Sequence, residues 1–304
     1  MTLGKCLLIL AGLAMPLAAQ DPPPTVFRSD SRLVVLHATV LDADGRLVTN
    51  LQQGAFHVLE NGVEQEVKVF RREDAPVSIG LVIDDSGSMT NKRDRVAAAA
   101  LALVEASHPD DEVFVVHFNE KAYMDLDFTH DRKRLGEGLA KLDSRGTTAM
   151  RDAVRLAIEH LQRKAAEDKK VLILITDGED NTSVIGQDYV IRAAQQSGVL
   201  IYAIGLLSEI DDQQTHRAQR DLDALTQATG GQSYYLKDAS EADRTALDIA
   251  HNIRNQYTLA YSPTNQVLDG MYRRILVKAS GPAPMTVLTR AGYWANGKGT
   301  VEDR

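Results

Sequence analysis

VSIGLVIDDSGSM, residues 77–89, is the stretch that decides how this chain of 304 residues is interpreted. Its first half, residues 77–83, is an almost continuous apolar run that stops at a turn signal. Such a run is typical of a central parallel strand that is covered on both faces. The small and acidic residues 84–88 then follow at the carboxyl end of the strand, where open α/β sheets place their ligand sites.

The loop carries side-chain oxygens at alternate positions, on Asp84, Ser86 and Ser88. Carboxylate and hydroxyl oxygens are hard ligands, which suit magnesium, calcium or manganese better than a soft metal. Gly87 allows the backbone to turn tightly enough for both hydroxyls to face one ion. The loop therefore predicts part of a divalent-ion site.

Strands and helices alternate from residue 77 onward. Strands are predicted at residues 77–83, 112–118, 171–176 and 199–205, and helices at 96–105, 132–142, 148–164, 189–197, 221–229 and 241–254. This alternation implies a mainly parallel sheet with helices on both faces. We therefore predict a doubly wound α/β domain at residues 76–255.

The residues on either side of this domain are patterned for β-structure. Phe56–Glu60 and residues 64–70 flank Asn61-Gly62, a strong hairpin signal, although Phe70 breaks the alternation of the second strand. Each flanking segment has too few strands to bury a core alone. We expect residues 30–72 and 256–294 to pair into one small β-sandwich-like domain, with the α/β domain inserted between them.

The two ends of the chain are predicted to lie outside these domains. Residues 1–20 are typical of a secretory signal peptide, with Lys5, an apolar run at 6–13 and a small-residue cleavage region. The alternative is a buried N-terminal helix, which the proline-rich linker at 21–29 disfavours. Residues 295–304 form a polar tail. We expect export to the periplasm or beyond the cell.

Composition narrows the function classes. Cys6, the only cysteine, lies inside the predicted signal peptide, so disulfides and thiolate metal sites are excluded from the exported chain. The formal net charge of −8 argues against nucleic acid as the partner, because phosphate binding needs clustered Lys and Arg.

Two further loops can supply oxygens to an ion at residues 84–88. Gly146-Thr147-Thr148 stands at the start of a predicted helix, and Asp177-Gly178-Glu179-Asp180 follows the predicted strand 171–176. Adjacent parallel strands bring such loops together at one edge of a sheet. Each residue has an ordinary alternative, since Thr148 could cap its helix and Asp177-Gly178 could be a common turn.

The motifs VIDDSGSM, GTTAMRDAV and LITDGED resemble those of von Willebrand factor type A domains, over about residues 76–255. The flanking segments resemble bacterial secreted proteins that carry β segments beside this domain. The resemblance implies a Rossmann-like doubly wound sheet with a metal-ion-dependent adhesion site. The matching residues of that site are Asp84, Ser86, Ser88, Thr148 and Asp177.

The resemblance also bears on the choice of threonine and of ion. Thr148 is preferred to Thr147, because the family places this residue at the helix start, three positions before Arg151 here. In the family, Mg²⁺ is the usual ion, with Ca²⁺ and Mn²⁺ as alternatives, and a carboxylate of a partner protein completes its shell. Asp85, Glu179 and Asp180 are expected to be outer-shell or solvated acids rather than ligands.

These observations predict a secreted, adhesion-type module that binds an unknown protein through its Asp or Glu carboxylate. One alternative is an envelope scaffold protein in which the metal only holds loops together. Another is a metal-dependent hydrolase or phosphotransferase. We predict a non-enzymatic protein, because Ser86 replaces the second acid of Asp-x-Asp, no lysine stands with the loop in an obvious role, and the serine hydrolase elbow is lacking.

Overall fold

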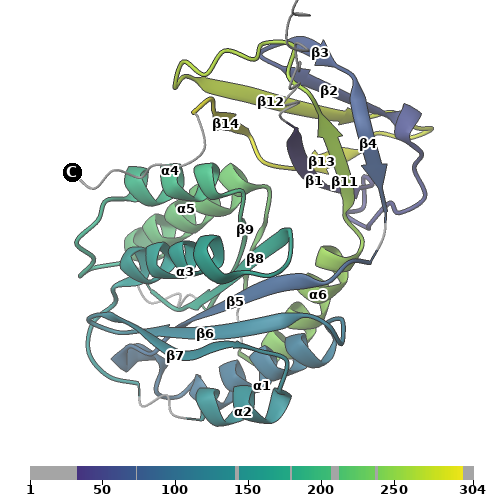
Figure 1. Cartoon of the computed structure of the whole chain (residues 1–304). Helices are drawn as coiled ribbons and strands as arrows, with labels where there is room; N and C mark the ends of the chain where they lie inside the picture. Colours follow the sequence, from purple (N-terminus) through teal and green to yellow (C-terminus); the bar gives the residue numbers. More distant parts are fainter. Residues whose placement is uncertain are drawn as a thin grey trace, which may run out of the picture. The chain divides into compact units, whose positions relative to one another are not determined.

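The computed structural model describes residues 33–72, 74–140, 144–178, 180–206, 212–236 and 239–296 (Figure 1). The predicted signal peptide and linker, and most of the predicted tail, lie outside these residues. The described residues form a six-stranded sheet with helices on both faces, and two four-stranded sheets. In this part of the chain, no helix is both long enough and apolar enough to cross a membrane.

The six-stranded sheet is built around β5, in which every residue is buried. Across the sheet the order is β10 (Ser233–Tyr235), β9 (Leu200–Gly205), β8 (Lys169–Thr176), β5 (Val77–Asp84), β6 (Glu112–Phe118) and β7 (Ala122–Thr129). All neighbours are parallel except β6 and β7. The predicted fold class, a doubly wound and mainly parallel sheet, is confirmed.

Helices cover both faces of this sheet, which explains the continuous apolar run of β5 (Figure 1). One layer contains α1 (Arg93–Glu105), α2 (Arg132–Leu139) and α6 (Ala242–Arg254), and the other α3 (Met150–Lys164), α4 (Gln187–Ser197) and α5 (Asp212–Thr229). Ile79 and Leu81 face the first layer, whereas Val82 faces the second. Gly80 is required within β5, because a Cβ there would lie 2.5 Å from the ring of Phe114.

Some predicted boundaries were wrong. Helix α5 begins at Asp212 rather than at residue 221, and α3 begins at Met150 rather than at Thr148. Strand β7 was not predicted, because it is an antiparallel edge strand in which buried, half-buried and exposed residues are mixed. Such a strand lacks both a continuous apolar run and clean alternation.

The flanking segments form the two smaller sheets. The first has the order β13 (Thr286–Leu288), β1 (Val34–Leu41), β11 (Tyr257–Tyr261) and β4 (Val67–Arg71). The second has the order β14 (Gly292–Trp294), β12 (Tyr272–Ala279), β2 (Phe56–Glu60) and β3 (Val63–Gln65). Each sheet therefore combines strands from both sides of the α/β part. The register of β4 against β11 shifts between Val67 and Val69, which explains why Phe70 breaks the alternation and why both Val67 and Phe70 pack against the same core.

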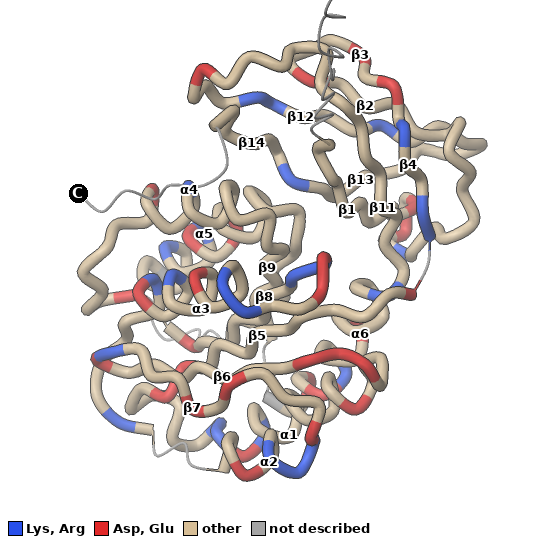
Figure 2. The backbone as a smooth tube through the Cα atoms, viewed as in Figure 1, with Lys and Arg blue, Asp and Glu red and all other residues tan. Residues whose placement is uncertain are grey.

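Short 3-10 helices occur at Gln53–Ala55, Gly87–Met89 and Ala239–Glu241. Lys and Arg are interspersed with Asp and Glu along the described chain (Figure 2). The second of these 3-10 helices lies in the loop after β5, so this loop has a defined backbone conformation.

Candidate metal centre

Asp84 is the last residue of β5, and only 2% of it is exposed. Its Oδ1 accepts a hydrogen bond from the backbone N–H of Ser86 at 2.9 Å. Its Oδ2 accepts one from Oγ1 of Thr176, the last residue of β8, at 2.6 Å. The carboxylate therefore links the carboxyl ends of two neighbouring parallel strands.

Burial is the main cause that raises the pKa of the Asp84 carboxyl, from 3.8 to about 6. The hydrogen bonds from Ser86 and Thr176 lower this pKa, and the negative charge of Asp177 raises it further. At neutral pH the folded chain thus holds a carboxylate whose charge is poorly solvated. A bound cation would offset that cost.

The hydroxyls of Ser86 and Ser88 extend this arrangement toward the next loop. Their Oγ atoms lie 3.1 Å apart, and Ser88 Oγ donates to Asp177 Oδ1 at 2.7 Å. Asp177 is the first residue after β8, and 1% of its side chain is exposed. A chain of hydrogen bonds therefore joins the loops after β5 and β8.

Thr148 reaches the same edge from the loop before α3. It is buried, whereas Thr147 is exposed. Its backbone N–H donates to Asn181 Oδ1 at 3.0 Å, but its hydroxyl makes no hydrogen bond with any described residue. The α3 N-cap is Ala149, so Thr148 does not cap the helix. Its hydroxyl is thus available as a ligand.

Asp85 holds the loop at residues 144–148 against the loop after β5. Its Oδ1 accepts a hydrogen bond from the backbone N–H of Ser144 at 2.7 Å, and its carbonyl accepts one from Arg145 at 2.8 Å. Gly146 in this loop has a φ of +78°, a conformation that favours glycine. Asp85 is therefore a buried positioning residue and not a solvated acid.

Asp180 has a similar role in the loop after β8. Its side chain is fully buried and accepts hydrogen bonds from the Arg151 backbone N–H at 2.7 Å and from Arg151 Nη2 at 2.9 Å. Ser183 Oγ donates to it at 2.6 Å. These contacts fasten the loop to the start of α3. Glu179 lies outside the described residues.

Lys92 is a member of this cluster that the sequence analysis missed. Its Nζ donates to Asp177 Oδ2 at 2.6 Å and to the carbonyl oxygen of Leu206 at 3.3 Å. The expectation that no lysine accompanies the loop was therefore wrong. Lys92 lies beyond the motif, at the N-cap of α1, and only the fold returns its side chain to the loops. The sequence feature that could have indicated it is a basic residue at the start of the helix that follows the motif.

These donors fit a hard divalent cation. The candidate ligands supply the oxygens of two carboxylates and three hydroxyls, on Asp84, Ser86, Ser88, Thr148 and Asp177. Among the described residues, no three His, Cys, Asp or Glu side chains are grouped as in a softer or all-acidic metal site. Because hydroxyls are uncharged, Asp84 and Asp177 are the only charged residues among the five candidate ligands.

The same contacts disfavour nucleophilic catalysis. Each Asp84 oxygen accepts a hydrogen bond in a buried position, and only its remaining lone pair is left to coordinate an ion. The hydroxyl of Ser86 contacts another hydroxyl, that of Ser88, rather than a general base.

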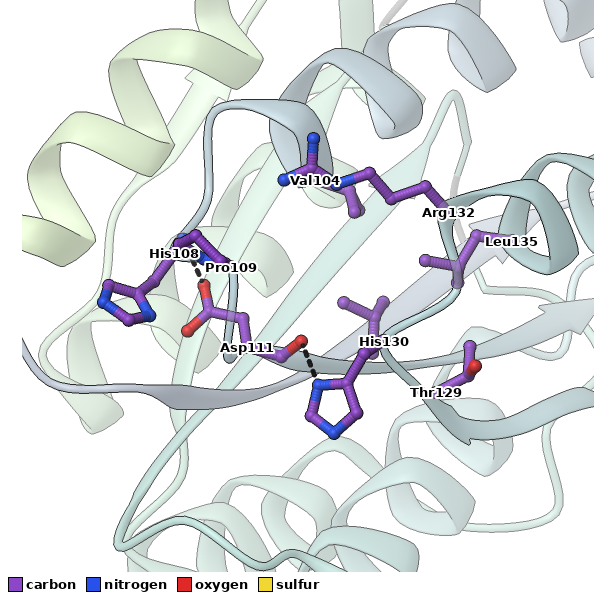
Figure 3. Close-up of a pocket in the computed structure, with 9 residues that line it drawn as sticks. Val104, His108, Pro109, Asp111, Thr129, His130, Arg132 and Leu135 are labelled. Atoms are coloured by element: carbon purple, nitrogen blue, oxygen red, sulfur yellow. Dashed lines mark hydrogen bonds between the residues drawn. The ribbon is translucent and has the colours of Figure 1, made fainter.

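A small pocket lies at the opposite end of β5 and β6 (Figure 3). It is lined by His108, Asp111, His130 and Arg132, among others. Asp111 Oδ1 accepts a hydrogen bond from the N–H of Val77, the first residue of β5, at 2.7 Å. Asp111 therefore fixes the start of β5, at the opposite end of this strand from the candidate metal ligands.

Comparison with known proteins agrees with the fold of the α/β part. Residues 79–179 match the family model of the von Willebrand factor type A domain. Calcium-activated chloride channel regulator 1 of Mus musculus is 31% identical over 167 residues, which are 52% of this chain and 17% of that protein. An uncharacterized protein of Synechocystis is 26% identical over 189 residues, which are 59% of this chain and 42% of that protein. The chain thus spans less than half of either relative.

A solved structure described as von Willebrand factor type A from Catenulispora acidiphila is similar at a TM-score of 0.51 and 14% identity. The similarity covers 87% of this chain and 75% of that one. Residues 77–254 make up less than 87% of the chain, so the similarity of fold also includes residues of the two four-stranded sheets.

Proposed function

This chain contains a von Willebrand factor type A domain, and we propose that it is an exported module that binds a partner protein through a divalent ion. Asp84, Ser86, Ser88, Thr148 and Asp177 would hold the ion. Mg²⁺ is the ion we favour, with Ca²⁺ and Mn²⁺ as alternatives. An Asp or Glu carboxylate of the partner would complete the shell.

The observation that carries this proposal is the series of side-chain oxygens that joins the loops after β5 and β8, beside the loop that carries Thr148. Hydrogen bonds connect Ser86, Ser88 and Asp177 in series, and the Thr148 hydroxyl has no described partner. Mg²⁺ prefers six oxygen ligands and keeps some of them as water, so these five side chains, acting directly or through water, leave room for an oxygen from outside. The bound ion would act as an electrophilic anchor for that oxygen.

The alternative role, in which the ion only fastens the loops, is less favoured by the contacts. Asp85 already joins the loop after β5 to residues 144 and 145. Asp180 joins the loop after β8 to Arg151. Because protein contacts already order these loops, the ion is available for a ligand from outside.

Calorimetric titration of the chain with MgCl₂ tests the shared premise. We expect one binding event in the parent and its loss in Asp84→Asn, which keeps the shape of the side chain but removes its charge. Asp94→Asn is the control, because the Asp94 side chain in the first turn of α1 is 93% exposed. Absence of binding in the parent, or equal binding in Asp84→Asn, would refute the metal site.

A second experiment separates partner binding from loop fastening. The chain, immobilised, is exposed to the extracellular fraction of its host in buffer with MgCl₂ and in buffer with EDTA. We expect a protein that is captured only with MgCl₂ and only by the parent, not by Asp84→Asn. A protein that remains bound in EDTA would contradict the bridging role of the ion.

A further inference from the structure

Lys92 places a positive charge between three strand ends. It follows β5 in the chain, its Nζ donates to Asp177 after β8, and it donates also to Leu206 after β9. The Lys92 side chain is 28% exposed, whereas that of Asp177 is 1% exposed. The ammonium group thus caps a buried carboxylate from the solvent side.

The two oxygens of Asp177 have different partners. Oδ2 contacts Lys92 at 2.6 Å, whereas Oδ1 contacts the hydroxyl of Ser88 at 2.7 Å. Only Oδ1 is turned toward the other candidate ligands. The lysine and a divalent ion can therefore share this carboxylate without competing for one oxygen atom.

A count of charges shows what the lysine changes. A divalent ion held by Asp84 and Asp177 alone would be neutralised, because the three hydroxyls carry no charge. Asp180, the next acid of the loop, is already paired with Arg151, and Asp85 is a further buried acid beside Asp84. Whatever these acids contribute, the charge of Lys92 makes the loaded site one unit more positive. An added positive charge repels a cation but attracts an external carboxylate.

We propose that Lys92 sets the balance of this site, weakening the binding of the divalent ion and strengthening the binding of the partner's carboxylate to the loaded site. This inference rests on the function proposed above. It assigns Lys92 a positioning and electrostatic role rather than a place among the ligands. A purely structural role, in which Lys92 only holds the carbonyl of Leu206 through a hydrogen bond, makes a different prediction. Loss of that hydrogen bond would weaken the binding of the divalent ion and of the partner's carboxylate together.

The test uses Lys92→Met and Lys92→Gln, which are neutral, and Lys92→Arg, which keeps the charge. Mg²⁺ affinity is measured by calorimetry at pH 7.5 and constant ionic strength. Acetate then serves as the carboxylate probe, and its affinity is measured by NMR chemical-shift titration at saturating MgCl₂. Thermal unfolding in EDTA checks that each variant is folded.

We expect both neutral variants to bind Mg²⁺ about fivefold to tenfold more tightly, and acetate more weakly by a similar factor. Lys92→Arg is expected to stay within about twofold of the parent in both titrations, because it keeps the positive charge. If the neutral variants weaken both affinities or change neither, the inference is overturned while the metal site stands. A parent that binds no Mg²⁺ refutes the proposed function itself, and this inference with it.

Discussion

Asp84 combines a buried position with a negative charge, and this combination has a measurable cost. Its folded-state pKa of about 6 lies above its ordinary value of 3.8, so folding favours the protonated form. The stabilisation from this protonation is fully present below pH 3.8 and is lost as the pH rises through 6. In the ion-free protein, the contribution of Asp84 to the free energy of unfolding is therefore least favourable above pH 6, where its buried carboxyl is charged.

Asp84→Asn is expected to stabilise the ion-free protein at pH 7 by up to about 3 kcal/mol, because it removes the buried charge. The difference between variant and parent should shrink toward pH 4, where the parent becomes protonated. Urea unfolding in EDTA at several pH values between 4 and 7 measures it. A difference independent of pH would show that the charge of Asp84 is not the cause.

Thr148→Val tests the contribution of a single hydroxyl. The side chain is nearly the same in shape, and the hydroxyl has no described partner to lose, so stability should change by less than about 1 kcal/mol. Mg²⁺ affinity should fall roughly tenfold, because one ligand oxygen is removed. Calorimetry checks the affinity and urea unfolding the stability.

Thr147→Val is the matched control, since Thr147 is the exposed neighbour of Thr148. It should leave Mg²⁺ affinity close to that of the parent. If Thr147→Val weakens Mg²⁺ binding and Thr148→Val does not, the choice between the two threonines is reversed.

At the scale of elements, the candidate site lies where the carboxyl ends of β5 and β8 meet. Hydrogen bonds hold the loops after these two strands and the loop before α3 together. The Gly87 backbone N–H donates to the carbonyl of Gly146 at 3.3 Å, and Asp85 holds Ser144. These contacts place the loop before α3 beside the loop after β5. The position of Thr148 therefore depends on the backbone conformation at Gly146.

Gly146→Ala is expected to destabilise the protein by about 1–2 kcal/mol, because residue 146 has a positive φ that alanine adopts at a cost. A Cβ there would also meet the carboxylate of Glu120. The displaced loop should lower Mg²⁺ affinity as well. Thermal unfolding and calorimetry provide the two measurements.

Gly54→Ala provides the comparison, in the 3-10 helix Gln53–Ala55. Gly54 has no positive φ, and no atom lies within 4 Å of the position its Cβ would occupy. This substitution should change neither stability nor affinity appreciably. Equal losses in the two variants would mean that the effect at Gly146 is not conformational.

At the scale of the whole molecule, the two smaller sheets depend on both ends of the described chain. β1 pairs with β11 and with β13, and β2 pairs with β12. Their shared core joins side chains from both segments, among them Leu36 and Tyr257, which are fully buried. Neither segment can bury these side chains without the other.

A chain that ends at residue 255 is therefore expected to lose the order of residues 34–71, while residues 77–254 stay folded. Limited proteolysis followed by mass spectrometry should show cleavage within residues 34–71 in the truncated chain but not in the full one. Mg²⁺ affinity should be retained within about threefold, because the five candidate ligands lie within residues 84–177. Protection of residues 34–71 in the truncated chain would contradict this view.

Much of the fold could be predicted from local patterns. Hydrophobic periodicity and turn residues located β5, β8 and β9, because a strand buried on both faces has a continuous apolar sequence. The edge strand β7 could not be recognised, since its mixed burial resembles neither a core strand nor a half-buried one. The start of α5 was also missed, because residues 212–220 are mostly polar.

The sequence by itself determined the doubly wound fold and named the five candidate ligands, because chain order and short motifs carry that information. Only the tertiary structure decided which charges meet. Lys92 and Asp177 are 85 positions apart, and they pair because two loops emerge from neighbouring strands. The burial of Asp84 and the pairing of the two flanking segments likewise depend on contacts between distant residues. Such contacts form only when the folded elements pack together, so they cannot be predicted from the local sequence pattern.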